Sequence, residues 1–246
     1  MGEGDGGFGG GVPMKTVALI VEHDTPDLLA LCLASLKRFA PEVRPLVVRG
    51  YEGAEAHAVE IEAARRHQKL GDAEIVILLD TDVVILSERW LPWVQRELAV
   101  ELAVGGLRHR GDVTQVYCQG HMLVHAHCLA MRRALFEDTN SFHATPPWDT
   151  AWQVTLYAGS ASTVVVPMMP SPSDWPDRVG VYVVDPGQGP YWAHLGRGTS
   201  FRPRGSWRER ARRLAARLGS HRAQKILSYQ QDRAEFLRKG WEIVRE

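Results

Sequence analysis

Short apolar runs alternate with helical patterns through the first half of the chain, and this alternation constrains the fold more than any other feature. The runs "TVALIVE" (16–22), "RPLVVRG" (44–50) and "EIVILLD" (74–80) read as strands, and runs apolar on both faces are typical of buried parallel strands. The spacing of apolar residues between them predicts helices over 27–39 and roughly 54–70. We therefore expect an α/β fold with a Rossmann-like, mostly parallel sheet flanked by helices.

The remaining elements are expected from shorter signals. Ser87 predicts the N-cap of a helix over 88–102. Further along, a strand passing into a short helix is predicted over 127–139, a helix from Asp149 to Gly159 and a strand over 162–169. The stretch from Pro167 to Pro190 is rich in Pro, Asp and Gly, which predicts a long surface loop.

The chain has 246 residues, a length that suits one large domain and a substantial core. We expect a flexible Gly-rich leader over 1–14, a domain over 15–205 and a basic helical extension over 206–246. Because the formal net charge is zero, the overall charge does not indicate a nucleic-acid partner. Three cysteines are too few for a disulfide framework, and no apolar run is long enough to cross a bilayer, so a cytoplasmic location is expected.

Two aspartates follow the third apolar run. Asp80 and Asp82 are two residues apart on extended chain, so their side chains leave the strand in similar directions at its carboxyl end. Such ends are where open α/β sheets bind ligands. Carboxylates are hard oxygen ligands suited to Mg²⁺ or Mn²⁺, and a cation there could stabilise a departing diphosphate. The simpler interpretation is that both residues cap the following turn.

The letters "LLDTDV" also resemble the nucleophile motif of haloacid-dehalogenase-type phosphatases. In that family the first aspartate, here Asp80, takes a phosphoryl group and the second acts as general acid. The family normally places this motif on its first strand and needs a downstream lysine. Here two strand–helix units precede the motif, and residues 106–205 contain no lysine. Both departures weaken the phosphatase hypothesis.

Three stretches taken in order resemble family-2-like glycosyltransferases with the GT-A fold. They are "VALIVEHDTPDLLALCLASLKRF", "AARRHQKLGDAEIVILLDTDVVILSERWL" and "LAMRRALFEDTNSFHATPPWDTAWQVTLYAG", and the resemblance covers about residues 15–200. The ordered set is more specific than an Asp-x-Asp motif alone. It implies an enzyme that transfers a sugar from a nucleotide-sugar donor.

The resemblance also implies roles for individual residues. Asp80, Asp82 and His194 would hold the metal ion, Mn²⁺ or Mg²⁺, and Asp149 would be the catalytic base of an inverting enzyme. The nucleotide-sugar would be bound by Val21, Glu22, His23, Asp24, Arg49, Arg65, Asp80, Thr81, Asp82 and Arg197. A retaining enzyme, or a non-catalytic module that binds a nucleotide-sugar, remains an alternative.

The chain departs from the family pattern at positions expected to contact the nucleotide and at the start of the helix that begins at Asp149. An aspartate that reads uracil often follows the second strand, where this chain has Arg49, so a UDP-, GDP- or dTDP-sugar remains possible. His23 and Asp24 replace the usual Tyr and Asn. The usual Glu-Asp pair is Trp148-Asp149, and helix capping is the simpler role for that aspartate. The acceptor is expected to be a hydroxyl compound.

Two further groups of residues suggest functional hypotheses. The segment 117–128 contains His121, His125 and His127 with two cysteines, so zinc binding competes with lining the acceptor side or packing in the core. Tryptophans near the motifs either stack on sugars or belong to the core. These are Trp148, Trp152 and Trp192.

The last part of the chain is strongly basic. The segment from Arg202 to Lys225 has a single acid, Glu209, and an apolar stripe. The stripe consists of Trp207, Ala211, Leu214, Ala215 and Leu218. The pattern predicts a helix that packs through this stripe and exposes its arginines. The alternatives are peripheral contact with an anionic membrane or a phosphate-bearing acceptor, whereas no nucleic-acid recognition motif is present.

Overall fold

The structure is a computed structural model of the chain. It describes residues 14–22, 25–49, 61, 70–106, 117–118, 121–122, 127–138, 163–166, 168–169, 175–176, 178–184, 186–196 and 206–246. The helix predicted from Asp149 to Gly159 lies outside these residues. The helix predicted over 54–70 does too, except for helical Ile61 and Leu70 in a turn.

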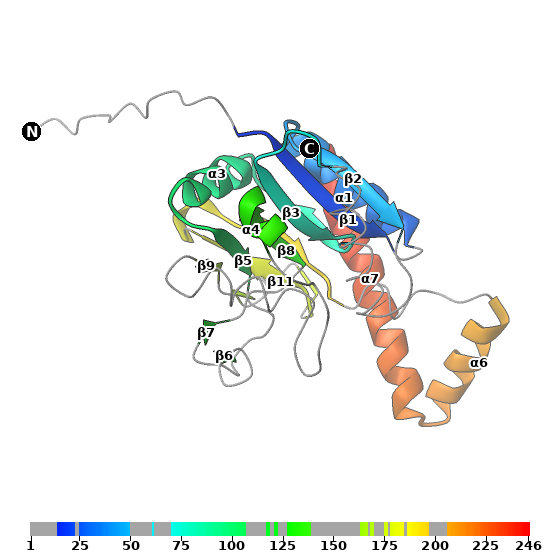
Figure 1. Ribbon diagram of the computed structural model, residues 1–246. Coiled ribbons are helices and arrows are strands. Elements are labelled where there is room, and N and C mark those ends of the chain that lie inside the picture. The colour runs from blue at the N-terminus through cyan, green and yellow to red at the C-terminus, as the bar shows by residue number, and fades with distance from the viewer. Residues whose placement is uncertain are drawn as a thin grey trace, which may run out of the picture.

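A six-stranded sheet forms the centre of the molecule (Figure 1). Its strand order is β2-β1-β3-β8-β5-β9, and only β8 runs antiparallel to its neighbours. The strands are β1 (Thr16–Glu22), β2 (Arg44–Arg49), β3 (Ile75–Asp80), β5 (Ala103–Gly106), β8 (Cys128–Arg132) and β9 (Thr163–Val166). The prediction of an α/β fold with a mostly parallel sheet is confirmed.

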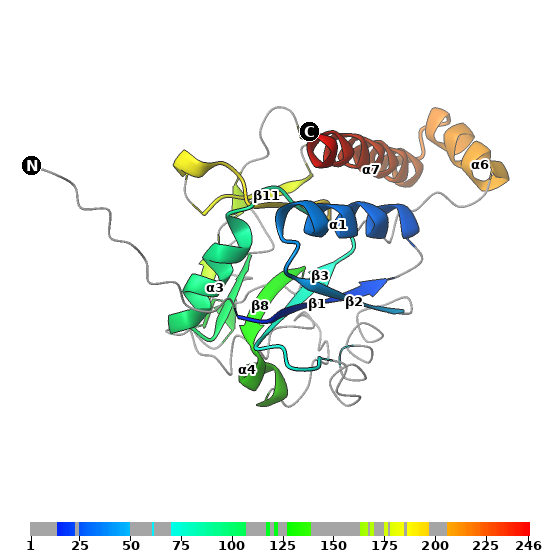
Figure 2. The same cartoon turned by 90° about the horizontal axis from the view of Figure 1, so that it is seen from above.

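Both faces of the sheet are covered, as the apolar runs predict. Alternate residues of β1 belong to different clusters, with Ala18 and Ile20 on one face and Val17 and Leu19 on the other. The first face packs against α1 (Pro26–Phe39) and α3 (Trp90–Val100), and the second against α4 (Arg133–Asp138). Figure 2 shows α1 and α4 on opposite sides of the sheet.

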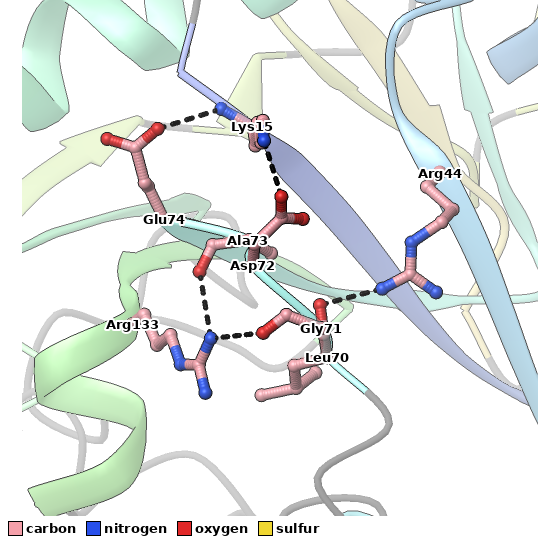
Figure 3. Close-up of polar contacts among 8 residues, drawn as sticks. All are labelled: Lys15, Arg44, Leu70, Gly71, Asp72, Ala73, Glu74 and Arg133. Carbon is pink, nitrogen blue, oxygen red and sulfur yellow. Dashed lines mark hydrogen bonds and ion pairs between the residues drawn. The ribbon is translucent and has the colours of Figure 1, made fainter.

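Polar contacts fasten the edge of the sheet at which β3 begins (Figure 3). The Lys15 amide donates to Oε1 of Glu74 at 3.3 Å, and the Lys15 ammonium pairs with Asp72. The guanidinium of Arg133 donates to the Gly71 carbonyl at 2.5 Å, and that of Arg44 to the Leu70 carbonyl at 2.7 Å. These contacts lie at the edge opposite the carboxyl ends of β1, β2 and β3.

A second sheet lies beside the first and has the order β10-β11-β12-β4. Its strands are β4 (Val83–Ile85), β10 (Met168–Met169), β11 (Gly180–Tyr182) and β12 (Trp192–His194). The prediction of a long surface loop over 167–190 is therefore wrong for the described residues, because β10 and β11 fall within it. Val179, Val181 and Tyr182 are buried there, and a short 3₁₀ helix spans Pro186–Gln188. The remaining described strands, β6 (Tyr117–Cys118) and β7 (His121–Met122), form a hairpin.

Two helices end the chain, α6 (Ser206–Arg217) and α7 (His221–Arg245). The second half of α7 packs on α1. Phe236 is fully buried in a cluster with Leu28 and Leu31, and the guanidinium of Arg233 pairs with Asp27 at 2.5 Å. Figure 2 shows α7 stacked on the outer side of α1, so it adds a layer to the body of the molecule.

Two sequence predictions differ from the structure in detail. The helix predicted over 88–102 begins at Trp90 with Arg89 as its N-cap. Ser87 instead accepts a hydrogen bond from the Arg89 amide through Oγ, at 3.2 Å. Two leucines of the apolar stripe predicted for the basic segment are not packed, since Leu214 is 59% and Leu218 79% exposed. Within the described part of the chain, no helix has the length and apolarity needed to span a membrane.

Candidate metal centre

The candidate site lies where β3 ends. Asp80 is the last residue of β3 and is paired with Val21 of the parallel neighbour β1. Thr81 and Asp82 form the turn that leads into β4. Both β3 and β4 are apolar and buried, so their packing fixes the two ends of this turn and leaves its carboxylates at the carboxyl edge of the sheet.

His194 reaches the same turn from a distant part of the sequence. It ends β12, whose antiparallel pairing with β4 places it opposite Val83. The Leu195 amide donates to the Asp82 carbonyl at 3.0 Å, which continues this pairing past the strand end. The second sheet therefore positions the histidine beside the turn that carries the carboxylates.

The three side chains form one compact group. Nε2 of His194 lies 3.3 Å from Oδ1 of Asp82 and 3.9 Å from Oδ2 of Asp80. One ligand atom from each residue lies within 4.8 Å of the others. The side chain of Asp82 is 7% exposed and that of Asp80 is 25% exposed, so solvent screens them only in part.

This donor set fits a divalent cation. Two carboxylates and an imidazole suit Mg²⁺ or Mn²⁺, and a cation would offset the cost of holding two like charges in a partly buried turn. Among the described residues, no other group of three carboxylate, imidazole or thiol side chains is gathered this closely. The resemblance-based prediction that Asp80, Asp82 and His194 lie together agrees with the geometry.

A series of stacked rings lies behind His194. The His127 ring stacks on the His194 ring with centroids 4.3 Å apart and an interplanar angle of 4°. His127 is 0% exposed and also contacts Tyr182, whose ring stacks on Trp192 at 4.7 Å. The His127 carbonyl accepts a hydrogen bond from the Asp80 amide at 2.9 Å. His127 therefore contacts the site through both its ring and its backbone.

The carboxylates affect buried groups next to the site. Burial raises the pKa of the Cys32 thiol, and the nearby charges of Asp82 and Asp80 raise it further. Burial likewise raises the pKa of the Tyr182 phenol, with smaller contributions from Cys128 and Asp82. These groups therefore stay protonated and neutral near pH 7 and add no further negative charge to the site.

The start of α1 adjoins the same turn. Oγ1 of Thr25 lies 3.2 Å from Oγ1 of Thr81, and both threonines are buried. Thr25 is the N-cap residue of α1, but its side chain does not cap the helix. Its amide instead donates to Oε1 of Glu22 at 2.6 Å. The end of β1, the start of α1 and the Asp80–Asp82 turn thus form one connected surface.

The predicted site residues divide into those the structure places and those it does not describe. Val21, Glu22, Asp80, Thr81, Asp82 and His194 lie at one edge of the sheet. Arg49 ends β2 opposite Glu22, and its side chain is not described. The other predicted site residues lie outside the described residues: His23, Asp24, Arg65, Asp149 and Arg197.

The structure also decides between hypotheses for two buried rings. Trp192 is 1% exposed and stacked among aromatic rings, so it is a core residue and does not offer a face to a sugar. His127 was noted only as part of a histidine-rich segment, and its contact with His194 was missed. The available signal was the apolar run Cys128–Arg132 that follows His127 and forms β8. Because β8 is antiparallel to β3, the residue before β8 lies beside the end of β3.

No family model and no curated protein matches the chain. Among solved structures, it is similar to the mannosyltransferase PcManGT from Pyrobaculum calidifontis in complex with GDP-Man and Mn²⁺, with 15% identity and a TM-score of 0.47. That match covers 63% of this chain and 55% of the mannosyltransferase chain.

Two other solved structures show a comparable likeness. A197 from STIV is 13% identical over 72% of this chain and 93% of its own, with a TM-score of 0.44. The galactosyltransferase LgtC in complex with donor and acceptor sugar analogues is 11% identical over 61% of this chain and 73% of its own, with a TM-score of 0.43. The solved structures that this chain resembles include a mannosyltransferase and a galactosyltransferase.

Proposed function

We propose that the chain is a metal-dependent glycosyltransferase that moves a sugar from a nucleotide-sugar donor to a hydroxyl acceptor. The observation that carries this proposal is the grouping of Asp80, Asp82 and His194 within 4.8 Å at the carboxyl edge of the sheet. The ordered sequence motifs described above support the same class. Mn²⁺ and Mg²⁺ both suit these donors.

The residues of this edge suggest how a donor is held. Nucleotides bind beyond the carboxyl ends of strands in open α/β sheets, and Val21 and Glu22 end β1 beside Asp80. The divalent cation, when bound, would stabilise the charge that develops on the leaving nucleoside diphosphate. We assign His23, Asp24, Arg49, Arg65, Thr81 and Arg197 to binding of the nucleotide and diphosphate.

The acceptor chemistry is assigned to Asp149. In this proposal its carboxylate takes the proton of the acceptor hydroxyl as that oxygen attacks the anomeric carbon, which gives inversion. The sequence order supports the assignment, since Asp149 stands at the acidic position of the family pattern. The free, buried thiols of Cys32 and Cys128 fit a reducing, cytoplasmic location.

Donor binding is tested by thermal unfolding with UDP, GDP or dTDP, each with and without Mn²⁺. We expect one diphosphate to raise the unfolding temperature only when the metal is present, because binding to the folded state stabilises it. Asp82→Ala should abolish this rise. Asp138→Ala, which changes an exposed carboxylate on α4, should keep it. A rise that persists in Asp82→Ala would contradict the assigned site.

Catalysis is tested with the matching sugar nucleotide. Transfer or hydrolysis of the sugar supports an enzyme, while binding without turnover indicates a non-catalytic module. Asp149→Ala should remove transfer and preserve donor binding. Proton NMR of the product anomer distinguishes inversion from retention. Release of phosphate from a generic phosphate ester would instead support the phosphatase alternative, with Asp80 as nucleophile.

A further inference from the structure

Helix α6 exposes apolar side chains on a strongly basic segment. Leu214 and Leu218 are 59% and 79% exposed, and together they account for two of the five large exposed hydrophobic residues among those described. They are spaced four residues apart, so they lie on one side of the helix. Ala211 precedes Leu214 by three residues, continues that side and is also exposed.

Arginines surround this apolar stripe in the sequence. Helix α6 contains five arginines and one acid, Glu209. Arg217 is exposed on α6, and Arg222 and Lys225 are exposed on the first turns of α7. Because the whole chain has zero formal net charge, the rest of the chain carries an excess of acidic residues. The positive charge is therefore concentrated at this end of the molecule.

A defined turn attaches α6 to α7. The Ser220 amide donates to the Ala215 carbonyl at 2.9 Å, and the Gly219 amide to the Ala216 carbonyl at 3.1 Å. This pair of bonds is a Schellman motif, and Gly219 has the positive φ, 87°, that the motif requires. Oγ of Ser220 then accepts from the Ala223 amide and caps α7. The direction of α6 relative to α7 is thus set by hydrogen bonds.

The body of the molecule leaves α6 at its periphery. The second half of α7 is fastened to α1 by Phe236 and Arg233, whereas its first half extends away from the sheet and carries α6 at its far end (Figures 1 and 2). In both views, β1 and β2 run toward the side of the molecule on which α6 lies. Because β3 is parallel to β1 and ends at Asp80, a surface contacted by α6 would lie on the side toward which β3 runs.

We propose that α6 binds peripherally to an anionic lipid bilayer. Leucines on one side of an Arg-rich helix match an interfacial helix, whose apolar side enters the boundary between headgroups and acyl chains while its cations contact anionic headgroups. The positive charge of the α6 segment favours an anionic bilayer over the other possible partners. A second copy that contacted this stripe through its own α6 would bring two strongly basic segments together, and their like charges would oppose the contact. Nucleic acid would use the arginines and leave the leucines exposed.

Vesicle flotation of the full chain tests the proposal, independently of any catalytic activity. At low salt, the protein should float with phosphatidylcholine vesicles that contain phosphatidylglycerol and should stay at the bottom with pure phosphatidylcholine vesicles. Raising the salt concentration should weaken binding, because salt screens the arginine–headgroup attraction. A wild-type chain that fails to float with the anionic vesicles overturns the proposal.

Variants test whether the exposed stripe of α6 contacts the bilayer. The double substitution Leu214→Asp and Leu218→Asp should lower vesicle binding more than about tenfold, since it removes two apolar groups from the bilayer boundary and adds two negative charges beside anionic headgroups. Val100→Asp is the matched control, because Val100 is 80% exposed at the end of α3, and its binding should be unchanged. Unchanged circular dichroism and unfolding temperature would show that both variants fold.

Two further outcomes count against the proposal. Undiminished binding by the Leu214→Asp/Leu218→Asp variant would show that α6 does not enter the bilayer. A wild-type dimer in light scattering that this variant abolishes would show that the stripe contacts a second copy instead. Reduced flotation of this variant, with unchanged flotation of Val100→Asp, supports the proposal.

Discussion

Nε2 of His194 lies 3.3 Å from Oδ1 of Asp82, and the pairing of β12 with β4 maintains this contact between distant parts of the chain. The contact makes the site depend on two sheets. The large sheet supplies the carboxylates at the end of β3, and the small sheet supplies the imidazole. A cation bound there would join the two sheets at their common edge.

The first prediction concerns Asp82→Asn and His194→Ala. The first replaces a charged ligand by a neutral one and the second removes a ligand, so each should weaken Mn²⁺ binding by at least about tenfold, the lower range seen when even outer partners of metal ligands are lost. Isothermal titration calorimetry or the Mn²⁺ electron paramagnetic resonance signal measures the affinity. Without metal, Asp82→Asn should unfold at the same or a higher temperature, because it removes the repulsion between Asp80 and Asp82.

The Mn²⁺ affinity measurement has a control variant and a result that would contradict the prediction. Asp138→Asn removes an exposed carboxylate on α4 and should leave Mn²⁺ affinity unchanged. If Asp82→Asn lowers stability without metal and leaves Mn²⁺ affinity intact, then the two carboxylates have a structural role in the turn and do not bind the cation.

The second prediction concerns His127 as a positioning residue. Its ring lies parallel to that of His194 at 4.3 Å, so removing it would leave the His194 ring free to rotate. We expect His127→Ala to weaken Mn²⁺ binding about tenfold. His127→Phe keeps a planar ring and should retain most of the affinity. Equal losses in the two variants would show that the ring stack does not orient His194.

Much of the central sheet could be predicted from the sequence, because local patterns determine it. The apolar runs that became β1 and β3 are buried on both faces, and α1 follows the predicted apolar spacing. The run that became β2 forms a strand at the edge of the sheet, where Val48 is buried and Val47 is exposed. Asp80 and Asp82 could be placed at a strand end for the same reason. The contribution of His194 was implied only by the family resemblance, since no local pattern brings β12 to β4.

Apart from the local difference at Ser87, the wrong predictions concern which distant segments contact one another. The strand β11 lies in a Pro- and Gly-rich stretch, and its pairing with β10 and β12 cannot be read from three residues. The stripe on α6 was expected to be packed because periodicity indicates an apolar side but not what covers it. Conversely, Phe236 and Gly240 on α7 contact α1, although the surrounding sequence is mostly polar.

The third prediction concerns this contact between α7 and α1. Phe236 is 0% exposed and packs against Trp175 with ring centroids 5.6 Å apart. Phe236→Ala should lower the free energy of unfolding by about 3–5 kcal/mol, the usual cost of truncating a buried phenylalanine. Leu214→Ala on exposed α6 is the control, with an expected change below about 0.5 kcal/mol. Chemical denaturation measures both, and equal small changes would show that α7 does not contribute to the core.

The fourth prediction concerns alkaline pH. Burial, followed by the charges of Asp82 and Asp80, raises the pKa of Cys32 above its ordinary value of 9.0. The folded state therefore keeps the thiol proton after the unfolded chain has released it. Ionisation of this thiol therefore does not lower the free energy of unfolding below about pH 9. As the pH rises further, the free energy of unfolding falls by up to about 1.4 kcal/mol per pH unit for each such group.

Cys32→Ala isolates the contribution of this one thiol. Urea unfolding between about pH 8 and 10.5 should show a shallower loss of stability in Cys32→Ala than in the wild-type chain, by at most the slope of one proton. The remaining slope belongs to groups such as Cys128 and Tyr182, whose pKa values burial also raises. The cavity that alanine leaves lowers the free energy of unfolding by the same amount at every pH. It therefore does not change the slope of stability against pH, which is the quantity compared. Identical slopes in the two proteins would show that Cys32 ionises in the folded state as readily as in the unfolded chain.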